Sequence, residues 1–232
     1  SANPTGPLHI GHGRGMILGE VTAKFLSYQG HKIAREYYVN DAGRQIDLLL
    51  VSVLLCHLGK NKHIFVDEKT NDDGHLVTYK GDYVNDVAIS LSHNLEKIDK
   101  DSILNLLDEP IDSLISFLKK HKSYSQMRNA LVNVIIDKYI KEDLSAVGIN
   151  FDSWFRESQL YETGLLDEVL LNIKNKNLSY SRDGALWFKN TQFGDDQDRV
   201  LIKKNGDMTY FATDIAYHVH KFKNHDVLID IW

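Results

Sequence analysis

The first 58 residues follow an order of loop, helix and strand patterns that restricts the fold more than any other feature of the chain. A loop rich in glycine and proline, "ANPTGPLHIGHGRG", leads into residues 16–28, where apolar side chains recur at helical spacing. Residues 32–41 alternate as a strand does, and residues 42–58 return to helical periodicity. Because this succession is typical of parallel α/β sheets, we expect an α/β fold.

Local signals predict where these elements begin and end. Gly30 suits the position just after the first helix, and Asp41 is predicted to cap the second. Residues 123–149 form a strongly amphipathic pattern with Gly148 near its end, and residues 150–155 read as a short strand. The α/β pattern therefore resumes in this part of the chain.

The last third of the chain combines a predicted helix, two predicted hairpins and a final strand. The helix is expected over residues 163–175, and the hairpins turn at the Asp183-Gly184 and Asn205-Gly206 dipeptides. A further helix is predicted over residues 213–222 with Thr213 as its cap. The apolar run 226–232 is predicted to be a strand.

The polarity of the sequence changes between the core segments. We expect one domain over residues 1–232, with a core of about 1–58, 123–157 and 207–232. Residues 59–122 contain a polar turn cluster and more charged helices, so they are predicted to be a first insertion, and residues 158–206 a second.

The composition limits the classes of function. Lys and Arg total 27 against 32 Asp and Glu, a formal charge of −5, so any nucleic-acid contact must be a local patch. The single Cys56 excludes an internal disulfide and fits a reducing compartment. No apolar run approaches the roughly 20 residues of a bilayer span, and no signal peptide is evident. We expect a cytoplasmic protein, and the absence of an initiator methionine predicts an excised fragment.

His9 and His12 distinguish the first loop from a generic glycine loop. A helix N-terminus presents unpaired N–H groups that suit phosphate, and Gly11, Gly13 and Gly15 would let the backbone approach it. Neither the dinucleotide fingerprint nor the P-loop spacing is present. The two imidazoles could donate hydrogen bonds to a phosphate as charge develops. A metal pair and a purely structural pair are the alternatives.

Several segments resemble one enzyme family. "HIGH", preceded by "ANPTGPL", is similar to the signature of class I aminoacyl-tRNA synthetases. The chain as a whole resembles the arginyl-tRNA synthetase catalytic domain, through the following segments: "REYYVNDAGRQI", "FDSWFRESQLYETG", "DGALWFK", "FGDDQDRVLIKKNGDMTYFATDIAYH" and "IDIW". The resemblance runs in order from one end to the other and is weak only over about residues 59–122.

The resemblance implies a Rossmann-like parallel-sheet nucleotide-binding domain with insertions, and the activity of an arginine-tRNA ligase. Such an enzyme activates L-arginine with ATP to an adenylate, releases pyrophosphate and transfers arginine to tRNA(Arg). It implies ATP as substrate with Mg²⁺, no tightly bound metal, no membrane partner and a monomer.

The resemblance also implies roles for particular residues. His9 and His12 match the catalytic histidines of the signature, and the ATP-binding positions are Pro7, His9, Gly11, His12 and Gly13. The arginine-binding positions are Ser1, Asn3, His12, Tyr210 and Asp214. A guanidinium is a permanently charged planar fork of donors, so a carboxylate such as Asp214 is its natural partner. No editing insertion is expected, because a non-cognate amino acid would leave the Asp214 carboxylate unpaired and would therefore bind poorly.

The sequence departs from the family pattern at Gly6, where many members carry a lysine. The family form with glycine usually has a KMSKS loop later in the chain, and that loop, a first core strand with an arginine-binding glutamate, an amino-terminal domain and an anticodon-binding domain are not among these residues. We therefore expect little or no aminoacylation by this chain alone.

Two further groups of residues leave their roles open. Lys203 and Lys204 could touch tRNA phosphates, although a solvated lysine pair is the commoner case. Trp154, Trp187 and Trp232 are expected to be core or interface residues. The alternatives for function are a nucleotidyltransferase that uses the same histidine signature, and a non-catalytic homologue that only binds nucleotide, RNA or protein.

Overall fold

The structure, a computed structural model, describes residues 1–65 and 78–231. By its internal contacts the chain divides into two compact units, residues 1–154 and 155–232, which are described separately. None of the described helices has both the length and the apolar character that crossing a bilayer requires. Part of the predicted first insertion and Trp232 lie outside the described residues.

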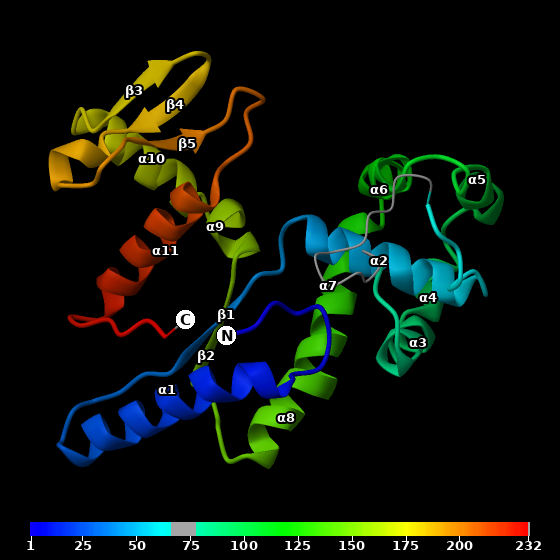
Figure 1. Ribbon diagram of the computed structural model, residues 1–232, viewed down its shortest axis with the longest axis horizontal. Coiled ribbons are helices and arrows are strands. Elements are labelled where there is room, and N and C mark those ends of the chain that lie inside the picture. Colours follow the sequence, from blue (N-terminus) through cyan, green and yellow to red (C-terminus); the bar gives the residue numbers. More distant parts are fainter. Residues whose placement is uncertain (66–77, 232) are drawn as a thin grey trace. The chain divides into compact units, whose positions relative to one another are not determined.

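The first unit is mainly helical (Figure 1). Its elements are α1 (Ile10–Tyr28), β1 (Glu36–Val39), α2 (Arg44–His57), α3 (Asp82–Ser90), α4 (Ser92–Leu95), α5 (Lys100–Asn105), α6 (Ile111–Lys120), α7 (Tyr124–Ile135), the π-helical turn η1 (Ile136–Ile140), α8 (Lys141–Ala146) and the start of β2 (Ser153–Arg156).

Strands β1 and β2 pair with each other and give this unit its α/β character. The backbone N–H groups of Asp152 and Ser153 donate to the carbonyl of Arg35 at 2.8 and 3.1 Å. Further along, the ring of Tyr37 stacks on Trp154 with centroids 4.5 Å apart. Because the contacts advance in the same direction along both strands, the pair is parallel, as the order of elements predicts.

The hydrophobic core of the first unit is built around α2. Residues 46–55 of this helix are all buried, and α3, α6 and α7 pack against it. Val87 of α3 and Leu114 of α6 are fully buried in the same cluster as Leu49 and Leu131. The described helices of the predicted first insertion thus contribute to the hydrophobic core of this unit, and the predicted boundaries of the insertion remain a prediction.

Helix α1 confirms one prediction and departs from another. Gly30 has a φ of 92°, so it occupies the left-handed position after the helix end as predicted. Yet Gly13 is the helix's one buried residue, while the predicted apolar face is exposed, with Val21 at 59% and Phe25 at 60%. The periodicity therefore predicted the helix correctly, but it did not show that the apolar face of the helix is exposed in this structure.

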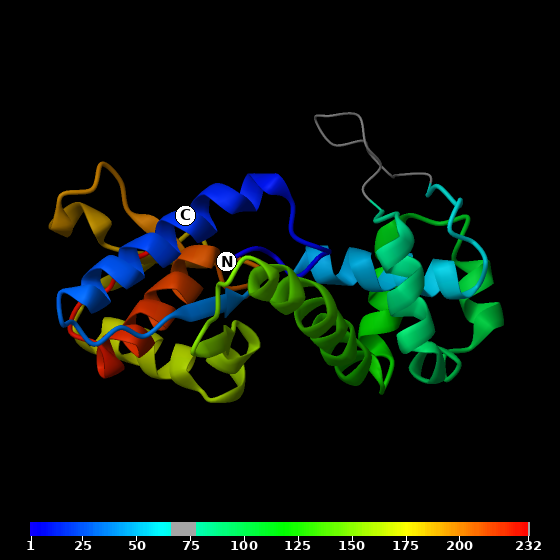
Figure 2. The ribbon, with the colours of Figure 1, turned by 90° about the horizontal axis from the view of Figure 1, so that it is seen from below.

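Helices α7 and α8 form one continuous rod through η1, visible in green in Figure 2. The rod covers most of the amphipathic pattern predicted over residues 123–149, and Gly148 follows its end with a φ of 73°. The short strand predicted directly afterwards is β2. Both predictions are confirmed.

The second unit packs a small sheet against helices. Its elements are the end of β2, α9 (Ser158–Glu162), α10 (Leu165–Asn175), β3 (Ser179–Arg182), β4 (Ala185–Phe188), the 3₁₀ turn η2 (Asn190–Phe193), β5 (Arg199–Ile202) and α11 (Tyr210–Asn224). The sheet order is β3-β4-β5, and both pairs are antiparallel. Helices α10 and α11 contact each other, β3 contacts α10, and β5 contacts α11 (Figure 1).

The first predicted hairpin is confirmed, and the second only in part. Asp183 and Gly184 adopt φ values of 53° and 80° between β3 and β4, as a type I′ turn requires. After β5, the chain turns at Gly206, but the return is a single bridge between Ile202 and Met208. The return strand is short because α11 begins at Tyr210.

Three other predictions are wrong. Asp41 does not cap α2, because that helix begins later, after Gly43. Thr213 is a buried residue within α11, and the cap is Thr209. Residues 226–231 form no strand in the described second unit, since they pair with no strand edge there and Asp230 bonds to side chains of α11 instead.

Candidate functional site

The two histidines of the first loop lie together at the N-terminus of α1. Their rings stack with centroids 3.7 Å apart and planes inclined by 25°. His9 is the N-cap residue, and its Nδ1 accepts a hydrogen bond from the N–H of Gly11 at 3.1 Å. The Nδ1 of His12 accepts from the N–H of His9 at 3.2 Å. The helix start is therefore capped by the same two side chains that the sequence singles out.

These bonds determine which ring nitrogen carries the proton. Because each Nδ1 accepts from a backbone N–H, each neutral ring must carry its proton on Nε2. Partial burial, the neighbouring His9 and the Ser1 amine lower the pKa of His12, which favours its neutral form. Both histidines thus present an Nε2–H donor beside a helix N-terminus whose first turn holds no acidic residue.

Gly11 is required for this arrangement. A Cβ atom at this position would lie 2.9 Å from Cε1 and 3.0 Å from Nδ1 of His9. Pro7 is exposed beside the pair, and Gly13 is buried one turn into the helix. The sequence-predicted residues Pro7, His9, Gly11, His12 and Gly13 are therefore contiguous around one helix start.

The loop before the histidines is held by bonds to the rest of the first unit. The Tyr37 hydroxyl accepts from the N–H of Ala2 at 2.7 Å and donates to its carbonyl at 3.0 Å. The side-chain amide of Asn3 donates to Gln45 at 2.7 Å. Ser1 and Asn3 are both exposed. The loop that carries the two predicted arginine-binding residues is thus anchored to β1 and α2.

Gly6, the position that departs from the family pattern, lies beside the ring of Tyr83. A Cβ atom on Gly6 would lie 3.2 Å from Cζ of Tyr83, whose hydroxyl donates to the carbonyl of Thr5 at 3.0 Å. A longer side chain at this position would therefore press on a residue of α3.

The second set of predicted residues lies on α11 in the second unit. Tyr210 is the first residue of this helix and is 74% exposed, and Asp214 lies one turn later on the same face. Although Asp214 is exposed as a residue, enough protein surrounds its carboxyl group to raise its pKa by partial desolvation. The structure thus forms two local clusters, one in each unit.

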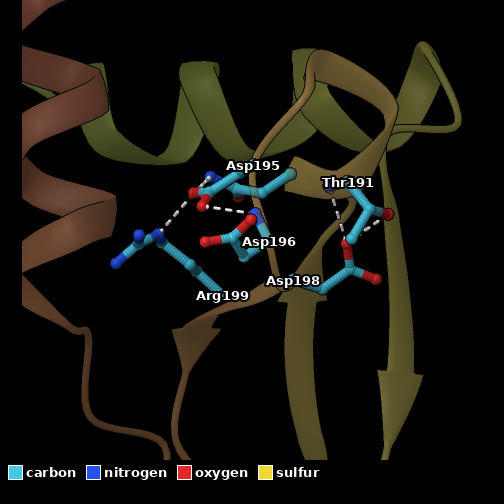
Figure 3. A network of polar contacts seen from close by, with 6 residues as sticks. Thr191, Asp195, Asp196, Asp198 and Arg199 are labelled. Carbon is cyan, nitrogen blue, oxygen red and sulfur yellow. Dashed lines mark hydrogen bonds and ion pairs between the residues drawn. The ribbon is translucent and has the colours of Figure 1, made fainter.

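The segment "FGDDQDR" forms a polar network beside α11. Figure 3 shows Asp195 accepting from Arg199 Nε at 2.9 Å and Asp198 accepting from the backbone and hydroxyl of Thr191 at 3.0 and 2.9 Å. These bonds lower the pKa of Asp198 and of Asp195. The network ties η2 to β5, and the Arg199 guanidinium lies 5.9 Å from the ring of Phe211.

Metal binding by the histidine pair was an open alternative. Among the described residues, no group of three or more His, Cys, Asp or Glu is arranged to hold a metal ion. The His9 and His12 Nδ1 atoms accept backbone hydrogen bonds. The atoms of the pair that remain for a ligand are therefore the two Nε2–H groups.

The remaining predicted residues lie as follows. Lys203 and Lys204 are exposed in the turn after β5. Trp154 packs partly buried against the core of the first unit, as expected. Trp187 is half-buried and donates from its indole N–H to the carbonyl of Arg182 at 3.3 Å.

Sequence reasoning missed residues that organise α11. Thr209 precedes the predicted Tyr210, and an "[ST]-x-x" capping signal could have identified it. Asp230, His218 and Lys221 form a charged cluster on the far part of this helix. Only the i, i+3 spacing of His218 and Lys221 is visible in the sequence, because Asp230 joins them from beyond the helix.

Comparison with known proteins supports one family. Residues 1–229 match the family described as tRNA synthetases class I (R), catalytic domain. The chain is 39% identical over 254 residues to an arginine-tRNA ligase of Hydrogenovibrio crunogenus, and 40% identical over 248 residues to one of Aquifex aeolicus. All of the chain is matched, but it spans only 42% of the length of each relative.

Solved structures agree with the fold. An arginyl-tRNA synthetase of Campylobacter jejuni is 32% identical with a TM-score of 0.72, over 97% of this chain and 44% of that one. The arginyl-tRNA synthetase of Thermus thermophilus, 21% identical with a TM-score of 0.53 over 94% of this chain and 34% of that one, supports the fold alone. The expected α/β fold with a parallel sheet is confirmed, and the chain belongs to the family of class I arginyl-type tRNA synthetase catalytic domains.

Proposed function

We propose that this chain supplies part of the catalytic site of an arginine-tRNA ligase. The complete enzyme would activate L-arginine with ATP, release pyrophosphate and transfer the arginyl group to the terminal ribose of tRNA(Arg). Family membership and relatives named as arginine-tRNA ligases support this activity. The observation that carries the proposal is the stacked His9 and His12 pair with both Nδ1 atoms engaged.

The first cluster would bind ATP. Two Nε2–H donors at a helix N-terminus can donate to phosphate oxygens, and their effect grows as negative charge develops during attack by the arginine carboxylate on the α-phosphate. Gly11 and Gly13 leave room near the backbone, and Pro7 flanks the nucleotide. Mg²⁺ would arrive with ATP and neutralise part of the triphosphate charge.

The second cluster would bind the arginine side chain. The Asp214 carboxylate can accept from the guanidinium, and the exposed Tyr210 ring or hydroxyl can orient it. Ser1, Asn3 and His12 would contact the amino and carboxyl groups. Lysine lacks the planar fork and would leave acceptors of the site unpaired, which provides discrimination without editing.

The wider context follows from the same proposal. We propose that the complete enzyme acts in the cytoplasm as a monomer.

The test is arginine-dependent ATP–pyrophosphate exchange by the full-length protein, with and without tRNA. We expect His12→Ala to lower the exchange rate by about 100-fold, the usual cost of removing one transition-state donor. Asp214→Ala should raise the KM for arginine by about 10- to 100-fold, because a charge-assisted hydrogen bond is lost.

Two matched variants serve as controls. His31→Ala removes an exposed histidine just beyond the end of α1, and Asp226→Ala removes an exposed acid beyond α11, so neither should change the exchange. Unchanged exchange in His12→Ala or Asp214→Ala would show that the site assignment is wrong. ATP binding without arginine-dependent exchange would favour the non-catalytic alternative.

A further inference from the structure

Helix α11 places two basic side chains on the same face as the acid proposed to bind arginine. Asp214, His218 and Lys221 follow each other at i, i+4 and i+7, so all three project from one side of the helix. Both basic groups are near enough to favour ionisation of the Asp214 carboxyl. If either basic side chain paired with the Asp214 carboxylate, it would compete with a cationic ligand for that carboxylate.

Asp230 binds both of these basic groups. Its Oδ1 accepts from the Lys221 ammonium, and its Oδ2 lies 3.1 Å from His218 Nε2. The Lys221 side chain is only 9% exposed, and its ammonium lies 4.5 Å from the centroid of the Tyr217 ring. Lys221 is thus held by a carboxylate on one side and an aromatic ring on another.

Both ring nitrogens of His218 face acceptor groups. Its Nδ1 lies 2.8 Å from the backbone carbonyl of Asp214, and its Nε2 faces the carboxylate of Asp230. A carbonyl and an ionised carboxylate can only accept. Asp230 therefore faces the Lys221 ammonium on one oxygen and the His218 imidazole on the other.

The two acids of this cluster differ in their surroundings. Burial opposes the ionisation of Asp230, but the bonds from Lys221 and His218 outweigh it and lower the pKa of this carboxyl. For Asp214, burial dominates and raises the pKa. Within the part of the chain that the structure describes, no side chain forms a hydrogen bond or ion pair with the Asp214 carboxylate.

We propose that Asp230 is a specificity-determining positioning residue. It acts as a counter-ion that keeps the Lys221 ammonium and the His218 imidazole on its own carboxylate, and so leaves Asp214 available for a guanidinium. This role rests on the proposed binding of arginine by Asp214. Asp230 itself need touch neither arginine nor ATP. Its replacement should therefore change the affinity for arginine, through Asp214, and leave the chemical step unchanged.

The test compares variants of the full-length enzyme in ATP–pyrophosphate exchange. In Asp230→Asn, Lys221 and His218 lose their counter-charge and can turn to Asp214. We expect the KM for arginine to rise by about tenfold, the weight of one charge-assisted hydrogen bond, while the KM for ATP and kcat stay within about twofold. Asp226→Asn, the same exchange of an exposed residue in the same segment, should change nothing.

Removing the competing cation should rescue the variant. Lys221→Met keeps the length and apolar stem of the side chain, so Asp230→Asn with Lys221→Met should return the KM for arginine toward that of the parent enzyme. Lys221→Met alone should not raise this KM. That single variant retains Asp230 and tests the idea even if Asp230→Asn fails to fold.

Several outcomes would overturn the inference. An unchanged KM for arginine in Asp230→Asn, an equal change in the KM for ATP or in kcat, or no rescue by Lys221→Met would each show a merely structural role. A raised KM in Lys221→Met alone would mean that this lysine assists binding. If Asp214→Asn also leaves the KM for arginine unchanged, the arginine site itself has failed, which is a distinct result.

Discussion

Helices α1 and α11 both present proposed functional side chains at an N-terminus, but they cap that terminus differently. In α1 the proposed catalytic His9 and His12 are themselves the caps. In α11 the cap is Thr209, whose hydroxyl accepts from the N–H of Ala212 at 3.3 Å and donates to the carbonyl of Val200 at 2.7 Å. In α1 the same side chains therefore cap the helix and are proposed to act on the substrate, whereas in α11 different residues have these two roles. We call the first the joined site and the second the separated site.

The surroundings of both sites favour the neutral form of the proposed functional group, through pKa shifts in opposite directions. The pKa of His12 is lowered and that of Asp214 is raised, so each is shifted toward its neutral form. A neutral His12 is a suitable Nε2–H donor to phosphate. A bound guanidinium would stabilise the ionised form of Asp214, because its positive charge offsets the free-energy cost of a partly desolvated carboxylate.

The largest expected effect comes from Gly11→Ala, which tests the joined site. The new Cβ atom would lie 2.9 Å from Cε1 of His9, so the ring would have to move. It would then lose the hydrogen bond from the Gly11 N–H that fixes its tautomer. We expect exchange by the full-length enzyme to fall by about 100-fold. The free energy of unfolding should change by less than about 1 kcal/mol, because the helix propensity of alanine offsets part of the lost cap.

Gly15→Ala is the matched control, since a Cβ at Gly15 meets no atom within 4 Å. It should stabilise the protein by about 0.5–1 kcal/mol and leave exchange unchanged. Thermal unfolding and exchange kinetics measure both quantities. If Gly11→Ala retains exchange within about twofold of the parent, the His9 ring does not act from this position.

The contrast between these helices also shows what the sequence could predict. The hairpin turn at Asp183-Gly184 and the position of Gly30 just after α1 were predicted, because each depends on the backbone of a few adjacent residues. The placement of His9 and His12 at one helix start followed from their spacing and the glycine loop. Their tautomers did not, since these depend on which backbone N–H each ring meets.

The errors share a different physical origin. Thr213 and Asp41 were predicted as caps because several cap-forming residues precede each helix, and tertiary bonds such as Thr209 to Val200 decide among them. The strand predicted at residues 226–232 needed a partner edge, which local sequence does not supply. The pairing of Asp230 with His218 spans 12 positions and crosses a helix end, so no periodicity could show it.

A smaller effect is expected from Thr209→Ala, which tests the separated site. Loss of the cap bonds should cost about 1 kcal/mol of unfolding free energy. Because Tyr210 and Asp214 lie in the first turns of α11, the KM for arginine should rise a few-fold while kcat is retained. Thr209→Ser keeps the hydroxyl and should behave as the parent. A fall in kcat comparable to that of Gly11→Ala would contradict the separation of cap and chemistry.

The smallest effect is the pH dependence of stability, for which the two sites have opposite signs. The pKa of His12 is lowered from 6.5, so the unfolded chain binds the proton first and stability falls as the pH drops below about 6.5. The pKa of Asp214 is raised from 3.8, so the folded protein binds the proton first and stability rises as the pH falls through that raised pKa. Each shift in Tm should be only about 1 °C, because solvent screens both groups.

Thermal unfolding of the full-length protein between pH 4 and 8, compared with His12→Asn and Asp214→Asn, isolates the two contributions. The parent should lose stability relative to His12→Asn below about pH 6.5, and gain it relative to Asp214→Asn at the acid end. Two differences of the same sign would mean that one carboxyl or imidazole has an environment other than the one described. Because the fold lowers the pKa of His12 and raises that of Asp214, binding of ATP and arginine should oppose both shifts, since each ligand carries the charge opposite to that of the ionised side chain.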